Sequence, residues 1–220
     1  MSPTLINCAH ATTNRKTKML KQYYPNQEFK ALLFDFDGTI ADTMGAHLVA
    51  WNKGLASYNL TLSREQHLAW AGRPTHNIVS MINEINKVQI PVDQFLKDKE
   101  VHYLSSLHEV KAIAPVVEVI KHYHGKTPLA IVTGSRRKMI NITLEHLGLT
   151  HYFDLLVCAE DYKNGKPAPD CFLQAAATLK VAPSECLVFE DAILGVESAL
   201  NAGMDCLRLT EDHSLKIQTR

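Results

Sequence analysis

Two aspartates, Asp35 and Asp37, follow an apolar run and are followed at once by Gly38 and Thr39. Burying both carboxylates without a partner is unfavourable. A divalent cation relieves their repulsion, and Mg²⁺ prefers carboxylate oxygens together with a substrate phosphate and water. One carboxylate can then attack phosphorus while the other, if protonated, protects the leaving oxygen. A turn with helix-capping aspartates explains the same pattern, so this pair alone leaves both interpretations open.

Thr133, Gly134 and Ser135 form a second polar segment, which follows another apolar run and precedes a helical pattern. Main-chain N–H groups at the start of a helix bind phosphate oxygens, so these residues are candidates for phosphate binding. Taken alone, the segment is better explained as an ordinary helix N-cap. Ser135 would satisfy that role by itself, because we predict a helix from about Arg136.

Lys166 lies between Gly165 and Pro167 in a loop that shows no helical period and that proline stiffens. A lysine held in this way suits an anionic phosphate, although most lysines are solvent-exposed. Glu190 and Asp191 are adjacent acids after a further apolar run. They are either a second source of metal ligands or the capped start of a helix.

The apolar runs before these polar segments predict the strands that position them. Each run is short and ends in polar residues, as in a parallel strand buried on both faces. Helical patterns at 139–147 and 170–179 lie between the runs, with Gly148 as a helix stop, so strands and helices alternate. This predicts an α/β fold with a doubly wound parallel sheet, whose strand ends bring the polar segments into one phosphoryl-transfer site. The predicted strands are 31–34, 129–132, 155–158 and 187–189.

A long helical insertion follows the first predicted strand. Such a segment greatly exceeds an ordinary connection, so we expect it to fold as its own unit above the strand ends. We predict a loosely ordered extension or short helix at 1–28, a core domain at 29–43 and 113–220, and a helical cap domain at 44–112. The predicted cap helices are 46–58, 63–71, 75–86 and 92–107.

The composition narrows the possible partners. The chain has 220 residues, 46% of them apolar, which is enough to bury a substantial core. Its 23 basic and 23 acidic residues balance, so we expect no nucleic-acid partner. Its five cysteines lack C-x-x-C spacing, which favours reduced thiols in the cytoplasm. No signal peptide or membrane span is evident, so we expect a cytoplasmic monomer or weak homo-oligomer with no membrane partner.

In this order, residues 35–39, 133–135, Lys166 and 190–191 resemble the four motifs of the haloacid dehalogenase superfamily. The resemblance extends from about residue 31 to residue 209. Within it, the segment 188–204 is similar to the branch that contains β-phosphoglucomutases and small sugar-phosphate phosphatases. The resemblance implies a Rossmann-like core with an inserted α-helical cap.

The same resemblance assigns roles to the motif residues. It implies that Asp35 is the nucleophile, forming an aspartyl-phosphate, and that Asp37 is the general acid and base. It implies Mg²⁺ as the cofactor. The implied phosphate-binding residues are Thr133, Gly134 and Lys166, and the implied metal ligands are Asp35, Glu190, Asp191 and the main-chain carbonyl of Asp37.

Other activities of the superfamily fit this sequence less well. The dehalogenases lack the second aspartate of the first motif, which is present here as Asp37. Phosphonate-cleaving relatives need a Schiff-base lysine in the cap, and nothing around Lys53 indicates a lowered pKa. A non-catalytic module that binds a phosphorylated metabolite is a minor alternative, because a degenerate member is expected to lose Asp35 or Asp37 first.

Thr43, His47 and Trp51 lie four residues apart and share one face of the first predicted cap helix. Equivalents of this set are found in β-phosphoglucomutases, so they favour a mutase. The interpretation that we prefer is that His47 hydrogen-bonds the nucleophile loop while Trp51 packs inside the cap, as also expected in related phosphatases.

The cap loop with Arg73 and Thr75 is expected to meet the substrate. A mutase usually has an arginine there for a second phosphate, but Thr75 takes that place and Arg73 comes earlier. The Gly-x-Pro-Thr pattern of this loop resembles phosphatases for fructose 1-phosphate and 6-phosphogluconate. Lys99 is a further candidate contact, although a charged run such as 97–100 is more often solvated. We therefore predict Mg²⁺-dependent hydrolysis of a small sugar phosphate of this type, with β-phosphoglucomutase as the alternative.

Overall fold

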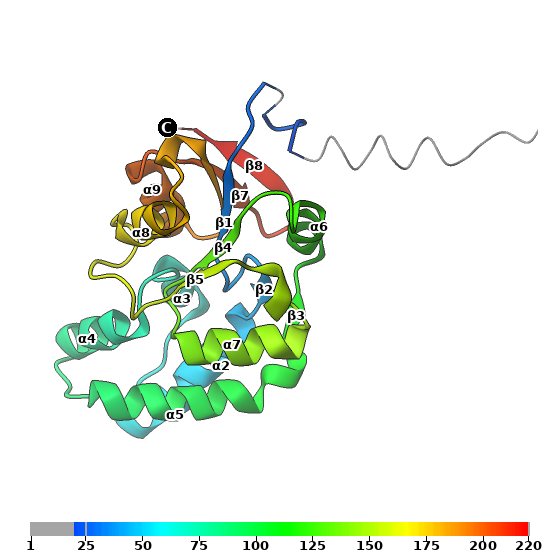
Figure 1. Cartoon of the computed structure of the whole chain (residues 1–220). Coiled ribbons are helices and arrows are strands. Elements are labelled where there is room, and N and C mark those ends of the chain that lie inside the picture. The colour runs from blue at the N-terminus through cyan, green and yellow to red at the C-terminus, as the bar shows by residue number, and fades with distance from the viewer. Residues whose placement is uncertain (1–19, 25, 220) are drawn as a thin grey trace, which may run out of the picture.

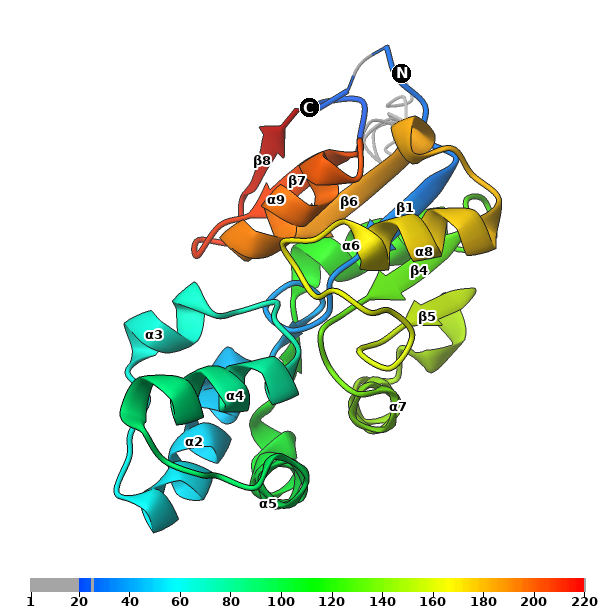
Figure 2. The same cartoon turned by 90° about the vertical axis from the view of Figure 1, so that its left-hand side faces the viewer.

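A computed structural model of the chain describes residues 20–24 and 26–219. Its centre is a six-stranded sheet in the order β5-β4-β1-β6-β7-β8 (Figure 2). Every neighbouring pair is parallel except β7 and β8, so the predicted doubly wound sheet is confirmed. The strands are β1 (Ala31–Phe34), β4 (Leu129–Val132), β5 (Leu155–Val157), β6 (Cys186–Glu190), β7 (Asp205–Leu209) and β8 (Leu215–Gln218).

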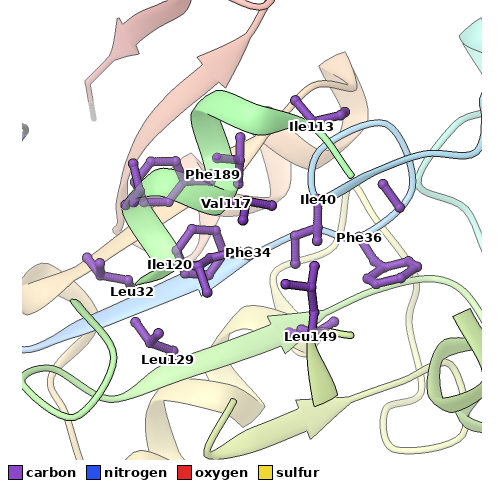
Figure 3. Packing of buried hydrophobic residues seen from close by; sticks show 14 of the residues in the cluster. Leu32, Phe34, Phe36, Ile40, Ile113, Val117, Ile120, Leu129, Leu149 and Phe189 are labelled. Carbon is purple, nitrogen blue, oxygen red and sulfur yellow. The ribbon is translucent and has the colours of Figure 1, made fainter. Parts of the chain in front are cut away.

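Both faces of the sheet are covered because neighbouring strand residues point to opposite sides. In β1, Leu32 and Phe34 join a cluster with α6 and α7, which Figure 3 shows from close by. Ala31 and Leu33 join a second cluster with α8 and α9. This explains why β1 is apolar throughout. The covering helices are α6 (Ala114–Tyr123), α7 (Arg137–Leu147), α8 (Asp170–Leu179) and α9 (Ile193–Asn201).

Four helices form the insertion between the first and second parallel strands. They gather beyond one end of the sheet, apart from α8 and α9 (Figures 1 and 2). Their own small core contains Trp51, Ile78 and Phe95. We call residues 44–112 the insert; its role as a separate domain stays a prediction. The helices are α2 (Met44–Leu55), α3 (Arg64–Ala69), α4 (Thr75–Asn86) and α5 (Val92–Ser105), close to the predicted ranges.

A two-stranded sheet lies where the chain passes between core and insert. It pairs β2 (Ala41–Asp42) with β3 (Lys111–Ala112) in antiparallel register. The connections from the core into the insert and back therefore lie side by side. Four short 3₁₀ helices complete the structure: η1 (Ala56–Tyr58), η2 (Leu107–Glu109), η3 (Thr150–Tyr152) and η4 (Pro183–Glu185).

The predicted N-terminal extension falls mostly outside the described residues. Of the part that is described, Leu20 and Tyr24 are buried against the first core cluster. None of the described helices has the length and apolar character that crossing a bilayer requires. Four of the five cysteines are described, and all four are buried and have free thiols: Cys158, Cys171, Cys186 and Cys206.

Candidate active site

Three carboxylates meet at the carboxyl ends of two neighbouring strands. Asp35 follows β1, while Glu190 ends β6 and Asp191 follows it. One oxygen from each lies within 4.8 Å of the others. The strand order reverses at β1, with β4 on one side and β6 on the other, and α/β sheets bind ligands at such a point. The sheet therefore brings the two predicted acid pairs together.

Lys166 supplies positive charge to this cluster. Its side chain comes from the loop before α8 and is only 1% exposed. Nζ donates to Asp35 Oδ1 at 2.6 Å and to Glu190 Oε1 at 2.7 Å. Burial lowers the pKa of Lys166, but the two carboxylates outweigh burial and hold the pKa well above its usual value. The interpretation of Lys166 as a solvated surface lysine is therefore wrong.

The carboxylate cluster fits a divalent cation. Burial and the neighbouring Glu190 raise the pKa of Asp35 well above its usual value and raise the pKa of Asp191 to about 7. Lys166 contacts two of the three carboxylates, so negative charge is in excess when all three are ionised. Oxygen ligands with excess negative charge are what Mg²⁺ requires. Gly38, at φ +90°, leaves room for the Asp191 carboxylate, which a Cβ at that position would overlap.

Asp37 is held on a different side of the site, by three donors. Thr43 Oγ1 donates to Oδ1 at 2.7 Å, and Ser135 Oγ donates to Oδ2 at 2.5 Å. His47 Nε2 lies 2.9 Å from Oδ1. Burial raises the pKa of Asp37, but His47 and the hydrogen bonds outweigh burial and hold the pKa well below its usual value. The turn after β1 therefore places two carboxylates in different surroundings.

The expected N-cap role of Ser135 is wrong. Helix α7 begins at Arg137, and its N-cap residue is Arg136, in an extended conformation. This frees the Ser135 side chain to reach Asp37. Capped helix starts are also absent at Glu190 and Asp191, because the N-cap of α9 is Ala192 and no side chain caps it.

The loop after β4 lies against the insert. Thr133 Oγ1 accepts a hydrogen bond from the main-chain N–H of Ser135 at 3.0 Å, which fixes the turn. A Cβ on Gly134 would lie 2.7 Å from Gly72 O and 3.2 Å from Arg73 O, so glycine permits this close approach. The loop that we predict to bind phosphate is thus the point where core and insert meet.

The insert extends this contact through His47, Lys99 and Tyr103. Lys99, the further candidate contact, is 8% exposed, so the alternative interpretation of a solvated lysine is wrong. Its Nζ lies 3.4 Å from His47 Nδ1, and the His47 ring stacks on Tyr103 at 4.4 Å. Tyr103 Oη lies 3.1 Å from Thr143 Oγ1 of the core. Burial, followed by Lys99, lowers the pKa of His47. The predicted contact between His47 and the nucleophile loop is present, and Trp51 packs on Phe95.

A cavity of about 60 Å³ lies between the core loops and the insert. The core contributes Asp35 and Asp37 together with residues 133–135. The predicted insert residues His47, Arg73, Thr75 and Lys99 also line it. Thr43, Lys166, Glu190 and Asp191 do not line it. Thr43 and Lys166 contact its two aspartates, and Glu190 and Asp191 belong to the carboxylate cluster with Asp35.

Sequence reasoning missed the contacts that Thr39 and Ser135 make with the acid pairs, and it missed His67 and Trp70 altogether. Thr39 Oγ1 donates to Asp191 Oδ1 at 2.8 Å, and Ser135 donates to Asp37. His67 and Trp70 line the cavity from α3 and its C-terminal end. The hydroxyl residue that follows the first acid pair was a usable signal for Thr39. Nothing in the sequence indicated His67 or Trp70, because their positions depend on how α3 packs.

Known proteins resemble this chain in sequence and in fold. A family model described as haloacid dehalogenase-like hydrolase matches residues 32–209. The fructose-1-phosphate phosphatase YqaB of Escherichia coli (strain K12) is 39% identical over 181 residues, covering 82% of this chain and 96% of that protein. The phosphorylated carbohydrates phosphatase of Thermotoga maritima is 29% identical over 180 residues, covering 80% and 82%. The structure of a β-phosphoglucomutase (pgmB) from Clostridium difficile matches with a TM-score of 0.73 and 25% identity, covering 82% and 84%.

Proposed function

This chain belongs to the haloacid dehalogenase-like hydrolases, and on that premise we propose that it is a Mg²⁺-dependent phosphatase of small sugar phosphates of the fructose 1-phosphate or 6-phosphogluconate type. One observation carries the proposal. Asp35 touches Lys166 inside a three-carboxylate cluster, while Asp37, two residues later, is held by separate donors. These are the parts that phosphoryl transfer through an enzyme carboxylate requires.

Asp35 is the proposed nucleophile and Asp37 the proposed general acid and base. A carboxylate oxygen of Asp35 bonds to phosphorus as the bond from phosphorus to the sugar oxygen breaks. The proton of Asp37 passes to that oxygen, and the sugar leaves. Asp37 then takes a proton from water as the water oxygen attacks phosphorus, the bond to Asp35 breaks, and inorganic phosphate forms.

The surroundings of Asp37 suit a group that changes protonation state. Donors from His47, Thr43 and Ser135 stabilise its carboxylate form and lower its pKa. Negative phosphate oxygens beside it raise the pKa again, because like charge disfavours ionisation. Asp37 therefore gains its proton most readily when substrate is bound, which is when a general acid is needed.

Phosphate binding is proposed for Thr133, Gly134 and Lys166. Lys166 already lies against the nucleophile, and the loop after β4 lines the cavity. The residues that would hold Mg²⁺ are Asp35, Glu190, Asp191 and the main-chain carbonyl of Asp37. When bound, Mg²⁺ supplies positive charge that offsets the charge of the phosphate and the carboxylates.

Hydrolysis is proposed over the mutase reaction because the relative at 39% identity is named a fructose-1-phosphate phosphatase. The test is phosphate release with Mg²⁺ from fructose 1-phosphate, 6-phosphogluconate, β-glucose 1-phosphate and nucleoside monophosphates. Glucose 6-phosphate formation is followed in parallel. We expect rapid phosphate release from one or a few sugar phosphates. Glucose 6-phosphate without free phosphate would identify a mutase, and no reaction in either assay would contradict the proposal.

Three broader expectations remain part of the proposal. Residues 44–112 are proposed as the cap domain over a core domain at 29–43 and 113–220, supported by the separate small core of the insert. A cytoplasmic location is supported by the free thiols among the described cysteines. The proposed oligomeric state is a monomer or weak homo-oligomer.

A further inference from the structure

The cavity at the active site is too small to admit a sugar phosphate. Its volume is about 60 Å³, which is room for on the order of five water molecules. A substrate therefore reaches Asp35 only if the insert moves away from the core, and the site closes again only if the insert returns. How closely the insert returns depends on the surfaces that meet, and beside Lys166 these surfaces include three glycines.

The insert loop at 72–74 packs directly on Lys166. A Cβ on Gly72 would lie 3.3 Å from Cδ of Lys166, so the backbone of this loop lies against the lysine side chain. Lys166 is 1% exposed and donates to Asp35 at 2.6 Å. Hydrogen bonds between charged groups are stronger where water is excluded. The insert thus supplies part of the cover that keeps Lys166 and Asp35 away from water.

Gly165, the residue before Lys166, leaves room for Pro74 of the insert. A Cβ on Gly165 would overlap Cδ of Pro74 and lie 2.8 Å from its Cγ. The next nearest atom, Nδ2 of Asn77 at 3.7 Å, also belongs to the insert. A proline ring cannot turn aside as a flexible side chain can. Gly165 has no positive φ, so alanine suits its backbone. Glycine is therefore needed here for the approach of the insert.

The other side of the insert is packed much less closely on the core. A second cavity, of about 640 Å³, lies between α3 and the end of β7. Arg64 and Glu211 form an exposed ion pair at 3.6 Å between these two elements. The insert thus has room to shift at α3, but it has none at loop 72–74, which meets both Gly134 and Gly165. The contact at this loop limits how near the insert comes to the proposed phosphate-binding residues.

We propose that Gly165 is a positioning residue for phosphoryl transfer, because its missing side chain lets Pro74 seat on the core and lets loop 72–74 cover Lys166. This inference rests on the proposed phosphatase function and deepens it. With a methyl group at position 165, the insert stays farther from the core and water reaches Lys166. The hydrogen bond from Lys166 to Asp35 then weakens, and so does the attraction of this lysine for a substrate phosphate.

The test is a pair of substitutions that creates the overlap and then removes it. Gly165→Ala should lower kcat/KM for the preferred sugar phosphate by at least about tenfold, because small displacements in an active site are costly. Pro74→Ala removes Cγ and Cδ, the two ring atoms that the new methyl group would meet. Added to Gly165→Ala, it should raise kcat/KM again by at least about threefold. A double variant no more active than Gly165→Ala would overturn the inference.

Gly45→Ala is the matched control for the added methyl group. Gly45 lies in the insert, has no positive φ, and a Cβ there would meet nothing within 4 Å, so kcat/KM should not change. Thermal unfolding checks that the variants fold. Gly165→Ala should unfold within about 3 °C of the unmodified protein. A Gly165→Ala protein that does not fold, alone or with Pro74→Ala, would show that glycine serves the core loop itself and would overturn the inference.

Amide hydrogen exchange decides the inference even if no sugar phosphate is turned over. Without any ligand, Gly165→Ala should speed exchange in segments 70–78 and 132–136 by at least about fivefold, because the contact between them opens more often. Exchange in β1 should not change, and adding Pro74→Ala should slow the two segments again. Unchanged exchange in Gly165→Ala would overturn the inference. Absence of phosphate release by the unmodified protein would instead overturn the proposed function and leave this comparison valid.

Discussion

The core and the insert each bury one lysine at the site, and they surround it differently. Lys166 of the core is 1% exposed and touches Asp35 and Glu190, which hold its pKa well above the usual value. Lys99 of the insert is 8% exposed and has His47 and an aromatic ring as neighbours, so burial lowers its pKa to about 8. Carboxylates in direct contact balance the charge of Lys166, whereas Asp37 and Glu100 only partly offset the cost of burying the charge of Lys99.

The two pKa shifts have opposite consequences for stability. Stability rises with pH wherever the unfolded chain binds more protons than the folded one. Because the pKa of Lys166 is raised in the folded protein, its protonation stabilises the fold at every pH below the pKa of this lysine in the unfolded chain. This contribution is lost only as pH rises through the higher pKa of Lys166 in the folded protein. The lowered pKa of Lys99 means a penalty at neutral pH, which fades as pH rises from about 8 to 10.5. The core charge supports the fold, whereas burial makes the insert charge destabilising at neutral pH.

The largest expected effect comes from removing the nucleophile. Asp35→Asn should lower kcat/KM by at least about 10⁴-fold, because the amide cannot form the phosphoryl bond. The fold should persist, since the change relieves repulsion among buried carboxylates. Phosphate release and thermal unfolding measure the two effects, with the exposed Asp42→Asn as the matched control. Unchanged turnover in Asp35→Asn would refute the proposed nucleophile and, with it, the division of roles between core and insert.

Removing the paired lysine should be the most damaging change to stability. Lys166→Met leaves Asp35 and Glu190 buried without their cation, and breaking such a pair costs about 3–5 kcal/mol of unfolding free energy. Denaturant unfolding in the presence of a chelator measures the loss. The exposed Lys163→Met in the same loop should change stability by less than about 0.5 kcal/mol. If both variants lose stability equally, the cluster does not depend on Lys166.

Removing Lys99 of the insert should have the opposite effect on stability: the free energy of unfolding should rise. Lys99→Met should stabilise the protein at pH 7 by on the order of 1–3 kcal/mol, because the penalty for burying the charge disappears. The difference from the unmodified protein should shrink as pH rises from about 8 to 10.5. Unfolding curves at several pH values test this, with the exposed Lys97→Met on the same helix as the control. A loss of stability at pH 7 that does not vary with pH would show that Lys99 is a structural residue.

The contrast between the two lysines also separates what the sequence predicts from what it does not. Asp35, Glu190 and Asp191 could be placed together because they follow buried parallel strands, and such strands end at one edge of the sheet. The sequence also made Lys166 a candidate for this site, because it lies in a loop that proline restricts. The local sequence pattern was sufficient to place a residue at the site wherever the sheet itself positions that residue.

The sequence left the positions open for residues that depend on packing between elements. The run 97–100 looks solvated in sequence, yet α5 packs along α2 and turns Lys99 inward. Ser135 looks like an N-cap, but the helix begins two residues later. Strand β7 carries Asp205 and Arg208 among its apolar residues, which weakens its pattern, and its neighbours in the sheet bury it nonetheless. Such outcomes depend on contacts that one local segment does not encode.

The smallest predicted effect concerns the contact that joins the two regions. Tyr103 of the insert and Thr143 of the core share a buried hydrogen bond of 3.1 Å. Tyr103→Phe keeps the ring that stacks on His47 and removes only the hydroxyl, so it should cost about 0.5–1.5 kcal/mol. Thr143 Oγ1 still donates to Met139 O, so the partner is not left unsatisfied and the lower end of this range is expected. Because the insert then loses a tie to the core while the carboxylate cluster is untouched, KM for a sugar phosphate should rise more than kcat falls. A fall in kcat at constant KM would instead show that the hydroxyl acts through His47 on Asp37, and that the insert shares in the chemistry that we assign to the core.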